Sequence, residues 1–332
     1  VIKKDSETDK PVSGAQFSLY ALEDIKNNAG KVIVKAGTKL ETAESDVNGN
    51  VVFSKDYPFA KYEIRETKAP KGYVSNNMVI VFDAKYQGQN QGTVKYQSEC
   101  RNTPTTFEFS KQDITSSAEI AGAKLEVTDK NGNVIDSWTS AAGEKHVIKY
   151  LVVGETYTLK ETLAPYGYLR ASEISFTVKD TEKIQSVTMK DETAKGTIII
   201  NKEGEFLEGK SFFDEITKNL KFSYIRKNLA GVTFNVYAAE DIVSVDGLNT
   251  IYHKKDELVG TIVTDKAGIG IMGNLPLGSY YLGETKTIEG FVLDSTPKPA
   301  ALIYKDDVTP VVFAKDTYNN ERQKISITLI KK

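Results

Sequence analysis

The chain of 332 residues contains one cysteine, two histidines, three methionines and one tryptophan. The single cysteine, Cys100, excludes an intramolecular disulfide framework. His146 and His253 stand alone in the sequence, so we expect no metal site and no cofactor. Acidic and basic residues number 45 and 43 and are interspersed, which argues against a nucleic-acid partner. No apolar run approaches the length of a membrane span, so we expect no membrane insertion in this segment.

Tyrosine and phenylalanine, by contrast, are plentiful, with 17 and 14 residues. They occur in short alternating runs between turns that are rich in Gly, Asn and Asp, and this pattern is typical of β-strands. We therefore predict an all-β fold. The length accommodates three domains of about 100 residues, each large enough to bury a core.

A five-residue pattern, Tyr-x-(Ile/Leu)-x-Glu, occurs three times, at residues 62–66, 157–161 and 280–284. Because side chains alternate across a strand, the final glutamate points the same way as the tyrosine and the aliphatic residue, into a core. A buried carboxylate is costly unless it is protonated or paired. The repeat of this pattern therefore indicates that three buried glutamates, Glu66, Glu161 and Glu284, share one chemical role.

Each glutamate begins a longer motif that runs into a turn. The motif continues as Ala-Pro-x-Gly-Tyr at residues 69–73 and 164–168, and a more divergent copy occupies residues 287–291. Proline and glycine at fixed offsets indicate one reverse turn used three times. A period of roughly 90–130 residues is too long for solenoid repeats. We therefore predict tandem domains, with bounds at 1–104, 105–193 and 194–322.

The strand that opens each repeat places a lysine on its apolar face. Lys111 lies on the face of two phenylalanines, and Lys202 lies on the face of two isoleucines. Lys3 is the equivalent residue in the first repeat, by its Lys-x-Asp spacing. A solvated lysine belongs on the polar face of a strand, so we predict that these three side chains are buried.

The strand that closes each repeat ends on an inward Asn or Asp. Asp191 points the same way as Val187 and Met189, and Asn102 and Asn320 occupy the corresponding places in the other repeats. Each domain is thus predicted to bury a lysine, a glutamate and an Asn or Asp on its first, middle and last strands.

This combination of residues can form a covalent bond. Burial disfavours ions, so it lowers the pKa of the lysine toward a nucleophilic amine and raises the pKa of the glutamate toward a neutral acid. The amine can attack the side-chain carbonyl of Asn or Asp while the glutamate shuttles the proton. The product is an isopeptide bond, with ammonia or water leaving. The alternative is a set of buried salt bridges that do not react.

In this order and spacing, the motifs resemble the CnaB-type (collagen-adhesin B-repeat, SpaA-like, prealbumin-fold) domains of Gram-positive surface adhesins and pilins, and they cover nearly the whole chain three times. The resemblance implies Ig-like antiparallel β-sandwiches with an autocatalytic crosslink between the first and last strands. It implies the crosslinks Lys3–Asn102, Lys111–Asp191 and Lys202–Asn320, with Glu66, Glu161 and Glu284 as proton shuttles.

The second and third repeats each differ from the first. The second resembles the sub-group in which aspartate replaces asparagine as the acceptor. In the third, Gly204 stands where the Lys-x-Asp motif has aspartate, and Ile288 stands where the turn has proline. The triad residues of the third repeat are nevertheless present.

The resemblance implies a structural role, as a stalk or shaft segment of a cell-wall-anchored surface adhesin or pilin whose partners are its neighbouring domains. An alternative is a module that binds a host protein or glycan through its loops. The Tyr-Pro-Lys motif of shaft pilins is absent, as are a Leu-Pro-x-Thr-Gly sorting signal and a signal peptide. We do not expect an enzyme, because each lysine nucleophile would react only once.

Two segments lie outside the repeat pattern. We expect the insertion at 206–228 to form a short amphipathic helix. Its expected role is a loop that covers the third sandwich, and the alternative role is a ligand contact. In the segment 323–332, Ile325, Ile327 and Leu329 share one face, which repeats the pattern of an opening strand. We expect this segment to dock on domain three as a closing strand or to begin a further repeat.

Overall fold

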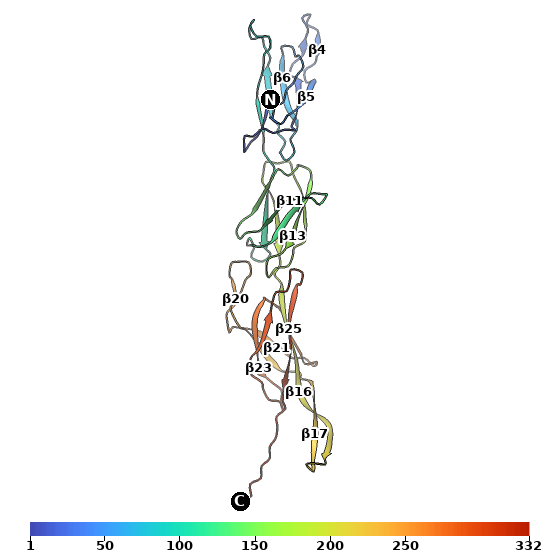
Figure 1. The fold of residues 1–332 in the computed structure, drawn as a ribbon, viewed down its shortest axis with the longest axis vertical. Coiled ribbons are helices and arrows are strands. Elements are labelled where there is room, and N and C mark those ends of the chain that lie inside the picture. Colours follow the sequence, from blue (N-terminus) through green and yellow to red (C-terminus); the bar gives the residue numbers. More distant parts are fainter. Residues whose placement is uncertain (332) are drawn as a thin grey trace.

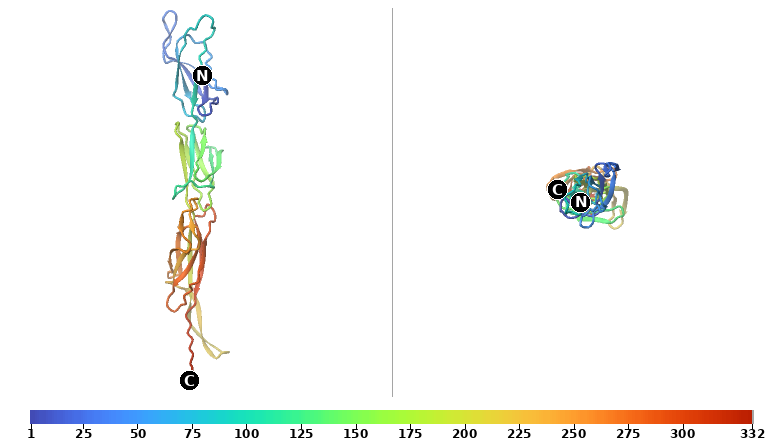
Figure 2. Two further views of the ribbon diagram at one scale, coloured as in Figure 1. Left: turned by 90° about the vertical axis from the view of Figure 1, so that its left-hand side faces the viewer. Right: turned by 90° about the horizontal axis from the view of Figure 1, so that it is seen from above.

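A computed structural model describes residues 1–331, in which strands alternate with turns and loops and no helix occurs. These residues accordingly contain no helix able to span a membrane. Three domains lie end to end and form a rod (Figures 1 and 2). Each domain combines a four-stranded antiparallel sheet with a second sheet, and each has its own apolar core. The prediction of an all-β fold is confirmed.

Domain one contains the first eight strands. Their bounds are β1 (Ile2–Asp5), β2 (Gln16–Ala21), β3 (Ile25–Lys26), β4 (Val32–Val34), β5 (Lys39–Glu44), β6 (Lys61–Lys68), β7 (Val79–Asp83) and β8 (Glu99–Asn102). The large sheet has the order β5-β2-β6-β7, while β1 pairs with β8 and β3 pairs with β4. Phe17 and Leu19 of β2 and Tyr62 of β6 are buried, as their alternation predicts.

Domain two repeats this arrangement with longer strands in its second sheet. The bounds are β9 (Thr106–Asp113), β10 (Lys124–Thr128), β11 (Val134–Thr139), β12 (His146–Lys149), β13 (Thr156–Leu163), β14 (Ile174–Thr177) and β15 (Gln185–Asp191). The sheets have the orders β11-β10-β13-β14 and β12-β9-β15. Phe107, Phe109 and Met189 of the second sheet pack into the core.

Domain three is the largest of the three. The bounds are β16 (Lys195–Asp214), β17 (Asn219–Asn228), β18 (Thr233–Ala238), β19 (Ile242–Val243), β20 (Ile251–His253), β21 (Leu258–Val263), β22 (Ile269–Leu275), β23 (Gly278–Lys286), β24 (Lys298–Leu302) and β25 (Val311–Asn320). One sheet has the order β21-β18-β23-β24, and the other is formed by β17, β16, β22 and β25.

The first and last strands of each domain are parallel neighbours, in the pairs β1–β8, β9–β15 and β16–β25. The residues opposite the three predicted lysines are Cys100 for Lys3, Met189 for Lys111 and Tyr318 for Lys202. In each case the predicted acceptor lies two residues further along the last strand. It therefore shares the face of the lysine, within reach of that long side chain.

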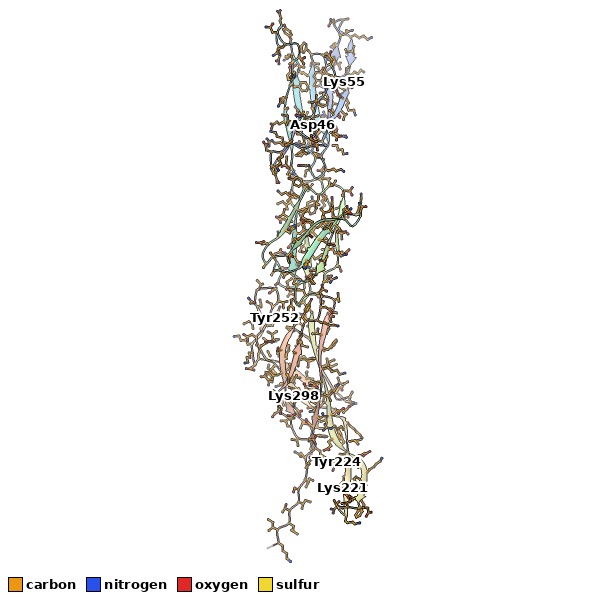
Figure 3. The ribbon with its side chains drawn as sticks, in the orientation of Figure 1. Asp46, Lys55, Lys221, Tyr224, Tyr252 and Lys298 are labelled. Atoms are coloured by element: carbon orange, nitrogen blue, oxygen red, sulfur yellow. The ribbon has the colours of Figure 1, made fainter. Side chains whose placement is uncertain are left out.

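The insertion at 206–228 is not a helix, so that prediction was wrong. β16 continues past Lys202 to Asp214 and pairs with β17 in an antiparallel hairpin. Asp214 accepts hydrogen bonds from the backbone N–H groups of Ile216 and Thr217, and Lys218 adopts a φ of 58°. Residues 214–218 therefore form the tight turn that joins β16 to β17. The hairpin, which carries Lys221 and Tyr224, projects from the end of the rod and does not cover the sandwich (Figure 3).

The segment after Arg322 extends away from domain three at the same end (Figure 1). Residues 323–331 are assigned no strand, so the expected closing strand that docks on domain three does not form in the described part of the segment. The other expectation, the start of a further repeat, stays a prediction. Lys332, the last residue of this segment, lies outside the described residues.

Side-chain contacts cross both domain junctions. At the first, the Tyr150 hydroxyl donates to Asp5 at 3.1 Å, and Lys149 pairs with Glu7. At the second, the Arg170 guanidinium donates three hydrogen bonds to Asp307, at 2.9–3.0 Å. The domain bounds predicted at residues 104 and 193 are therefore flanked by contacts that orient each domain on the next.

Candidate functional site

In every domain the structure brings the predicted lysine, glutamate and Asn or Asp together inside the sandwich. The lysine comes from the first strand, the glutamate from β6, β13 or β23, and the acceptor from the last strand. The nine residues are Lys3, Glu66 and Asn102; Lys111, Glu161 and Asp191; and Lys202, Glu284 and Asn320. Their side chains are almost completely buried, with at most 3% exposed.

Domain three has the most complete network of contacts. Lys202 Nζ lies 2.6 Å from Asn320 Oδ1 and 2.9 Å from Glu284 Oε2. The Asn320 amide nitrogen donates to Glu284 Oε1 at 2.6 Å and to the Thr287 hydroxyl at 2.8 Å. One carboxylate thus bridges the amine that would attack and the amide nitrogen that would leave. The ring of Phe234 lies 5.5 Å from Lys202 Nζ and closes the site.

Domain two presents a carboxylic acid in place of the amide. Lys111 Nζ contacts Asp191 Oδ1 directly and lies 2.9 Å from Glu161 Oε1. The second oxygen of Glu161 accepts a hydrogen bond from the backbone N–H of Ala171 at 2.7 Å. This bond fixes the orientation of the glutamate, so that its first oxygen faces the lysine.

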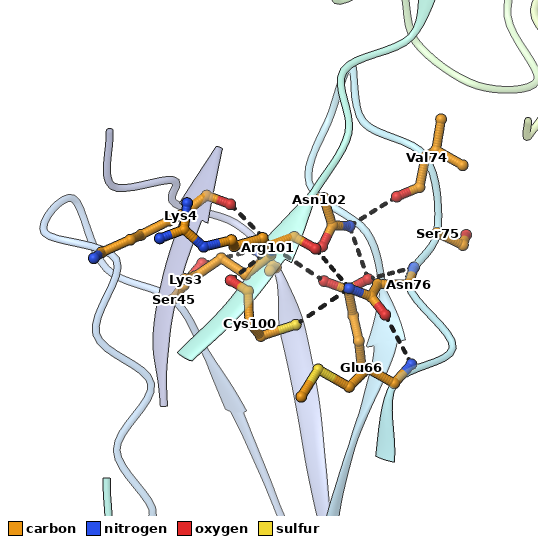
Figure 4. Close-up of polar contacts among 12 residues, drawn as sticks. Lys3, Lys4, Ser45, Glu66, Val74, Ser75, Asn76, Cys100, Arg101 and Asn102 are labelled. Carbon is orange, nitrogen blue, oxygen red and sulfur yellow. Dashed lines mark hydrogen bonds and ion pairs between the residues drawn. The ribbon is translucent and has the colours of Figure 1, made fainter. Parts of the chain in front are cut away.

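Domain one has the same residues in a looser arrangement (Figure 4). Asn102 Nδ2 donates to Glu66 Oε2 at 2.8 Å, and the backbone N–H of Asn76 donates to the same oxygen at 2.9 Å. Lys3 Nζ lies 3.9 Å from Glu66 Oε1 and donates to the Cys100 carbonyl at 3.3 Å. Asn102 Oδ1 is buried and has no hydrogen-bond partner among the described residues, so the carbonyl is open to the amine.

Burial shifts the pKa values of four triad residues toward their neutral forms. Desolvation lowers the pKa of Lys3 and of Lys202, and it raises the pKa of Glu66. Desolvation also raises the pKa of Asp191 to about 7, although Lys111 acts in the opposite direction. A neutral amine is a nucleophile and a protonated carboxyl can supply its hydroxyl as water, so these shifts favour amide formation.

The aspartate of the Lys-x-Asp motif has a role that sequence reasoning did not assign. Asp5 accepts hydrogen bonds from the backbone N–H groups of Glu7 and Thr8, each at 2.8 Å, and from the Tyr73 hydroxyl at 3.0 Å. Asp113 makes the corresponding bond with Tyr168 at 2.9 Å. The aspartate therefore ties the end of the first strand to the Gly-Tyr turn that follows the glutamate.

In domain three both members of this pair are replaced. Gly204 stands in place of the aspartate and Phe291 in place of the tyrosine. A Cβ atom at Gly204 would lie 2.4 Å from the Phe291 ring, so the ring occupies the space of the missing side chain. Asp and Tyr are thus replaced together, by Gly and Phe. The Asp–Tyr contact of domains one and two could have been inferred from this joint replacement in the sequence.

Among the described residues, no group of three or more His, Cys, Asp or Glu side chains is placed to hold a metal ion. Cys100 is buried next to the site of domain one, where burial raises the pKa of its thiol. A thiol with a raised pKa is a poor nucleophile, so Cys100 is a weaker candidate nucleophile than Lys3.

Comparison with known proteins gives one family and a set of similar structures. The model of the SpaA family, described as a prealbumin-like fold domain, matches residues 1–99, 105–193 and 219–317. The Bacillus anthracis TIE protein is similar to the chain, with 20% sequence identity and a TM-score of 0.54. The similarity covers 96% of this chain and 49% of that one, so the chain spans about half the length of that protein.

Two further solved structures have lower TM-scores. BcpA, the major pilin subunit of Bacillus cereus, is 17% identical with a TM-score of 0.42, and 97% of this chain and 98% of that chain are covered. A C-terminal fragment of the pilus adhesin SpaC from Lactobacillus rhamnosus GG is 19% identical with a TM-score of 0.36. The similarity covers 58% of this chain and 96% of that fragment. No curated protein matches the chain.

Proposed function

The chain belongs to the SpaA family of prealbumin-like fold domains, and we propose that its three domains form a stalk segment of a Gram-positive surface adhesin or pilin. We further propose that each domain is stabilised by an intramolecular isopeptide bond, which joins Lys3 to Asn102, Lys111 to Asp191 and Lys202 to Asn320. The observation that carries this proposal is the buried Glu284 carboxylate, which contacts both the amine and the amide nitrogen in domain three.

The reaction follows from that geometry. The lone pair of Lys202 Nζ attacks Cγ of Asn320, and a C–N bond forms. Glu284 takes a proton from the amine on one oxygen and delivers a proton to the amide nitrogen through the other. The old C–N bond then breaks, and ammonia leaves. In domain two the acceptor is a carboxylic acid, so the hydroxyl of Asp191 leaves as water.

A bond at this place suits a chain that is pulled from its ends. The first strand enters each domain and the last strand leads out toward the next, and the lysine and its acceptor lie near the ends of these neighbouring parallel strands. A crosslink there carries the force directly from one strand to the other. The remainder of the domain is bypassed, and its hydrogen-bond ladders are not loaded.

The crosslinks would also compensate for the lack of disulfides. Lys111 and Asp191 are 80 residues apart, and Lys202 and Asn320 are 118 residues apart. If the loop-entropy treatment of disulfides applies, closing loops of this size stabilises each folded domain by about 4–5 kcal/mol. This large effect requires no cofactor and no partner.

The intact mass of the denatured chain tests the proposal. We expect a mass below that of the sequence by two ammonias and one water. A variant in which Glu66, Glu161 and Glu284 are all replaced by Gln should recover the mass expected from its sequence, because the proton shuttle is removed. The full sequence mass for the parent chain would show that the triads are unreactive salt bridges.

A further inference from the structure

The loop that follows the Gly-Tyr turn orients the glutamate in domains one and two. This glutamate loop comprises residues 74–76 in domain one and 169–171 in domain two. The backbone N–H of Asn76 donates to Glu66 Oε2 at 2.9 Å, and the backbone N–H of Ala171 donates to Glu161 Oε2 at 2.7 Å. Asn76 and Ala171 each lie ten residues after the glutamate that they contact. The same position in the repeat therefore fixes the carboxylate that is proposed to move the proton.

The preceding residue of each glutamate loop contacts the next domain. In domain one the backbone N–H of Ser75 donates to Asp180 Oδ1 of domain two at 2.8 Å. In domain two the backbone N–H of Arg170 donates to the Asp307 carbonyl of domain three at 2.8 Å, and the guanidinium donates to the Asp307 carboxylate. One backbone N–H of the loop thus binds the neighbouring domain, and the next one binds the glutamate.

Both aspartates come from the same loop of the fold. Asp180 lies between β14 and β15, and Asp307 lies between β24 and β25, which are the corresponding strands of domain three. Asp180 is exposed, whereas Asp307 is buried and also accepts a hydrogen bond from the Ala164 N–H at 3.1 Å. In domains two and three, the loop before the last strand therefore holds the glutamate loop of the preceding domain.

The two glutamate loops differ in how firmly their own domain holds them. The Asn76 side chain donates to the Arg101 carbonyl of β8 at 2.5 Å, so the last strand of domain one also anchors its loop. Ala171 has only a methyl group and can make no such bond. The hold on the loop of domain two therefore depends more on the next domain than the hold on the loop of domain one.

We propose that Asp180 and Asp307 are positioning residues for the crosslink of the preceding domain, so that docking of the next domain accelerates formation of the bond. This inference rests on the proposed function, because it requires that the triads react. A loop held from the next domain keeps its N–H on one oxygen of the glutamate and leaves the other oxygen facing the lysine. Without that hold, the carboxylate samples more orientations, and fewer of them contact the amine.

The rates of the three crosslinks in the full chain test the proposal. Cell-free synthesis is stopped, and branched peptides are quantified by mass spectrometry of digests at successive times. Asp180→Ala should slow the Lys3–Asn102 bond about three- to tenfold, the range for loss of one hydrogen bond, and leave the other two bonds unchanged. Glu182→Ala, which removes the same charge from an exposed position of the same loop, should leave all three bonds at the parent rate.

The second junction gives a parallel test. Asp307→Ala should slow the crosslink of domain two by a larger factor than Asp180→Ala slows that of domain one, because the loop of domain two depends more on its neighbour. Asp306→Ala is the matched control, since the Asp306 carboxylate accepts a hydrogen bond from the Val308 N–H within its own loop. This control should leave the crosslink of domain two at the parent rate.

Further measurements separate a positioning role from a merely structural one. Asp180→Asn keeps a side-chain oxygen that can accept the Ser75 N–H, so it should restore the rate of the domain one crosslink to within about twofold of the parent. Hydrogen exchange in Asp180→Ala should become faster at residues 74–76 and stay unchanged in β6 and β8, whereas a loss of domain stability would speed exchange throughout domain one. The crosslink of domain three, whose glutamate contacts Lys202 and Asn320, should form at the parent rate in every variant.

The outcomes distinguish this inference from the proposed function. If the parent forms all three branched peptides and Asp180→Ala forms them at the same rates, the inference is overturned and the proposed function stands. Equal slowing by Glu182→Ala, or no rescue by Asp180→Asn, also overturns the inference alone. If the parent forms no branched peptide, the triads are unreactive, and both the proposed function and this inference are wrong.

Discussion

Each of the three glutamates uses its two oxygens for different tasks. In domain three, Glu284 contacts the amine with one oxygen and the amide nitrogen with the other. In domain two, one oxygen of Glu161 is fixed by the Ala171 N–H and the other faces Lys111. A group that bridges the donor and the recipient of a proton is placed for transfer, which supports the proposed acid–base role of the glutamate.

At the residue scale, Glu161→Gln should leave domain two folded but without its crosslink. Glutamine keeps the shape of the side chain, but it cannot take a proton from the amine. We expect the mass of the variant to exceed that of the parent by about one water, and the stability of domain two to fall by about 4–5 kcal/mol. Mass spectrometry of tryptic digests should find no branched peptide that joins Lys111 to Asp191.

Glu182→Gln is the matched control, because Glu182 is an exposed glutamate of the same domain. It should retain the branched peptide and the parent stability. A branched peptide in the Glu161→Gln variant would show that another group moves the proton.

At the scale of elements, the turn after β1 connects the triad of domain one to the first domain junction. Asp5 ends β1, accepts two backbone N–H groups of its own turn, and binds the hydroxyls of Tyr73 and Tyr150. Tyr150 belongs to domain two, so a single carboxylate stabilises both the turn and the contact with the next domain. In domain three the hairpin and the pair Gly204 and Phe291 take the place of this turn.

Asp5→Asn should destabilise domain one at neutral pH by about 1–3 kcal/mol, because Asn cannot satisfy all the donors around this position. Burial raises the pKa of Asp5, but the hydrogen bonds from Thr8, Glu7, Tyr73 and Tyr150 outweigh it and hold the pKa below the ordinary value of 3.8. The carboxylate therefore stabilises the fold above about pH 3.8, and this contribution is lost as the pH falls through the lowered value.

Thermal unfolding at pH 7 and at pH 3 or lower measures this effect. The difference in melting temperature between the parent and Asp5→Asn should be largest at pH 7 and should become smaller in acid. Asp56→Asn serves as the control, because Asp56 is exposed. A difference that does not change with pH would mean that the charge of Asp5 contributes nothing.

At the scale of the whole molecule, short linkers and side-chain contacts align the domains. Asp307 of domain three accepts a hydrogen bond from the Ala164 N–H at 3.1 Å and bonds from Arg170. The Tyr304 hydroxyl donates to the Tyr168 carbonyl at 2.9 Å. These contacts surround the second linker, so bending at that point requires several of them to break.

Asp307→Ala should therefore loosen the junction between domains two and three. A domain of about 100 residues has a radius of gyration near 13 Å, and solution scattering of the parent should show a rod about three domains long. The variant should have a shorter maximum dimension and a broader distance distribution. Asp306→Ala should match the parent, because the Asp306 carboxylate accepts a hydrogen bond from the Val308 N–H within its own loop and is half-buried. A compact parent profile would contradict a stalk.

The sequence by itself determined the features that depend on local alternation. A side chain two residues from a buried one shares its face, so Lys111, Glu161 and Asp191 could be assigned to the interior without knowledge of the fold. The threefold repetition of these residues then defined the domains. The same reasoning indicated that residues 324–331 have the pattern of a strand.

Only the tertiary structure decided which edges meet, because strand pairing joins residues that are far apart in the sequence. The parallel pairing of first and last strands depends on such contacts. The insertion at 206–228 was assigned wrongly because Phe212, Ile216 and Leu220 fit a helical spacing, whereas β16 extends into the insertion and provides an edge for β17. The distances within each triad follow from packing, which places the glutamate between the two strands that it would help to join.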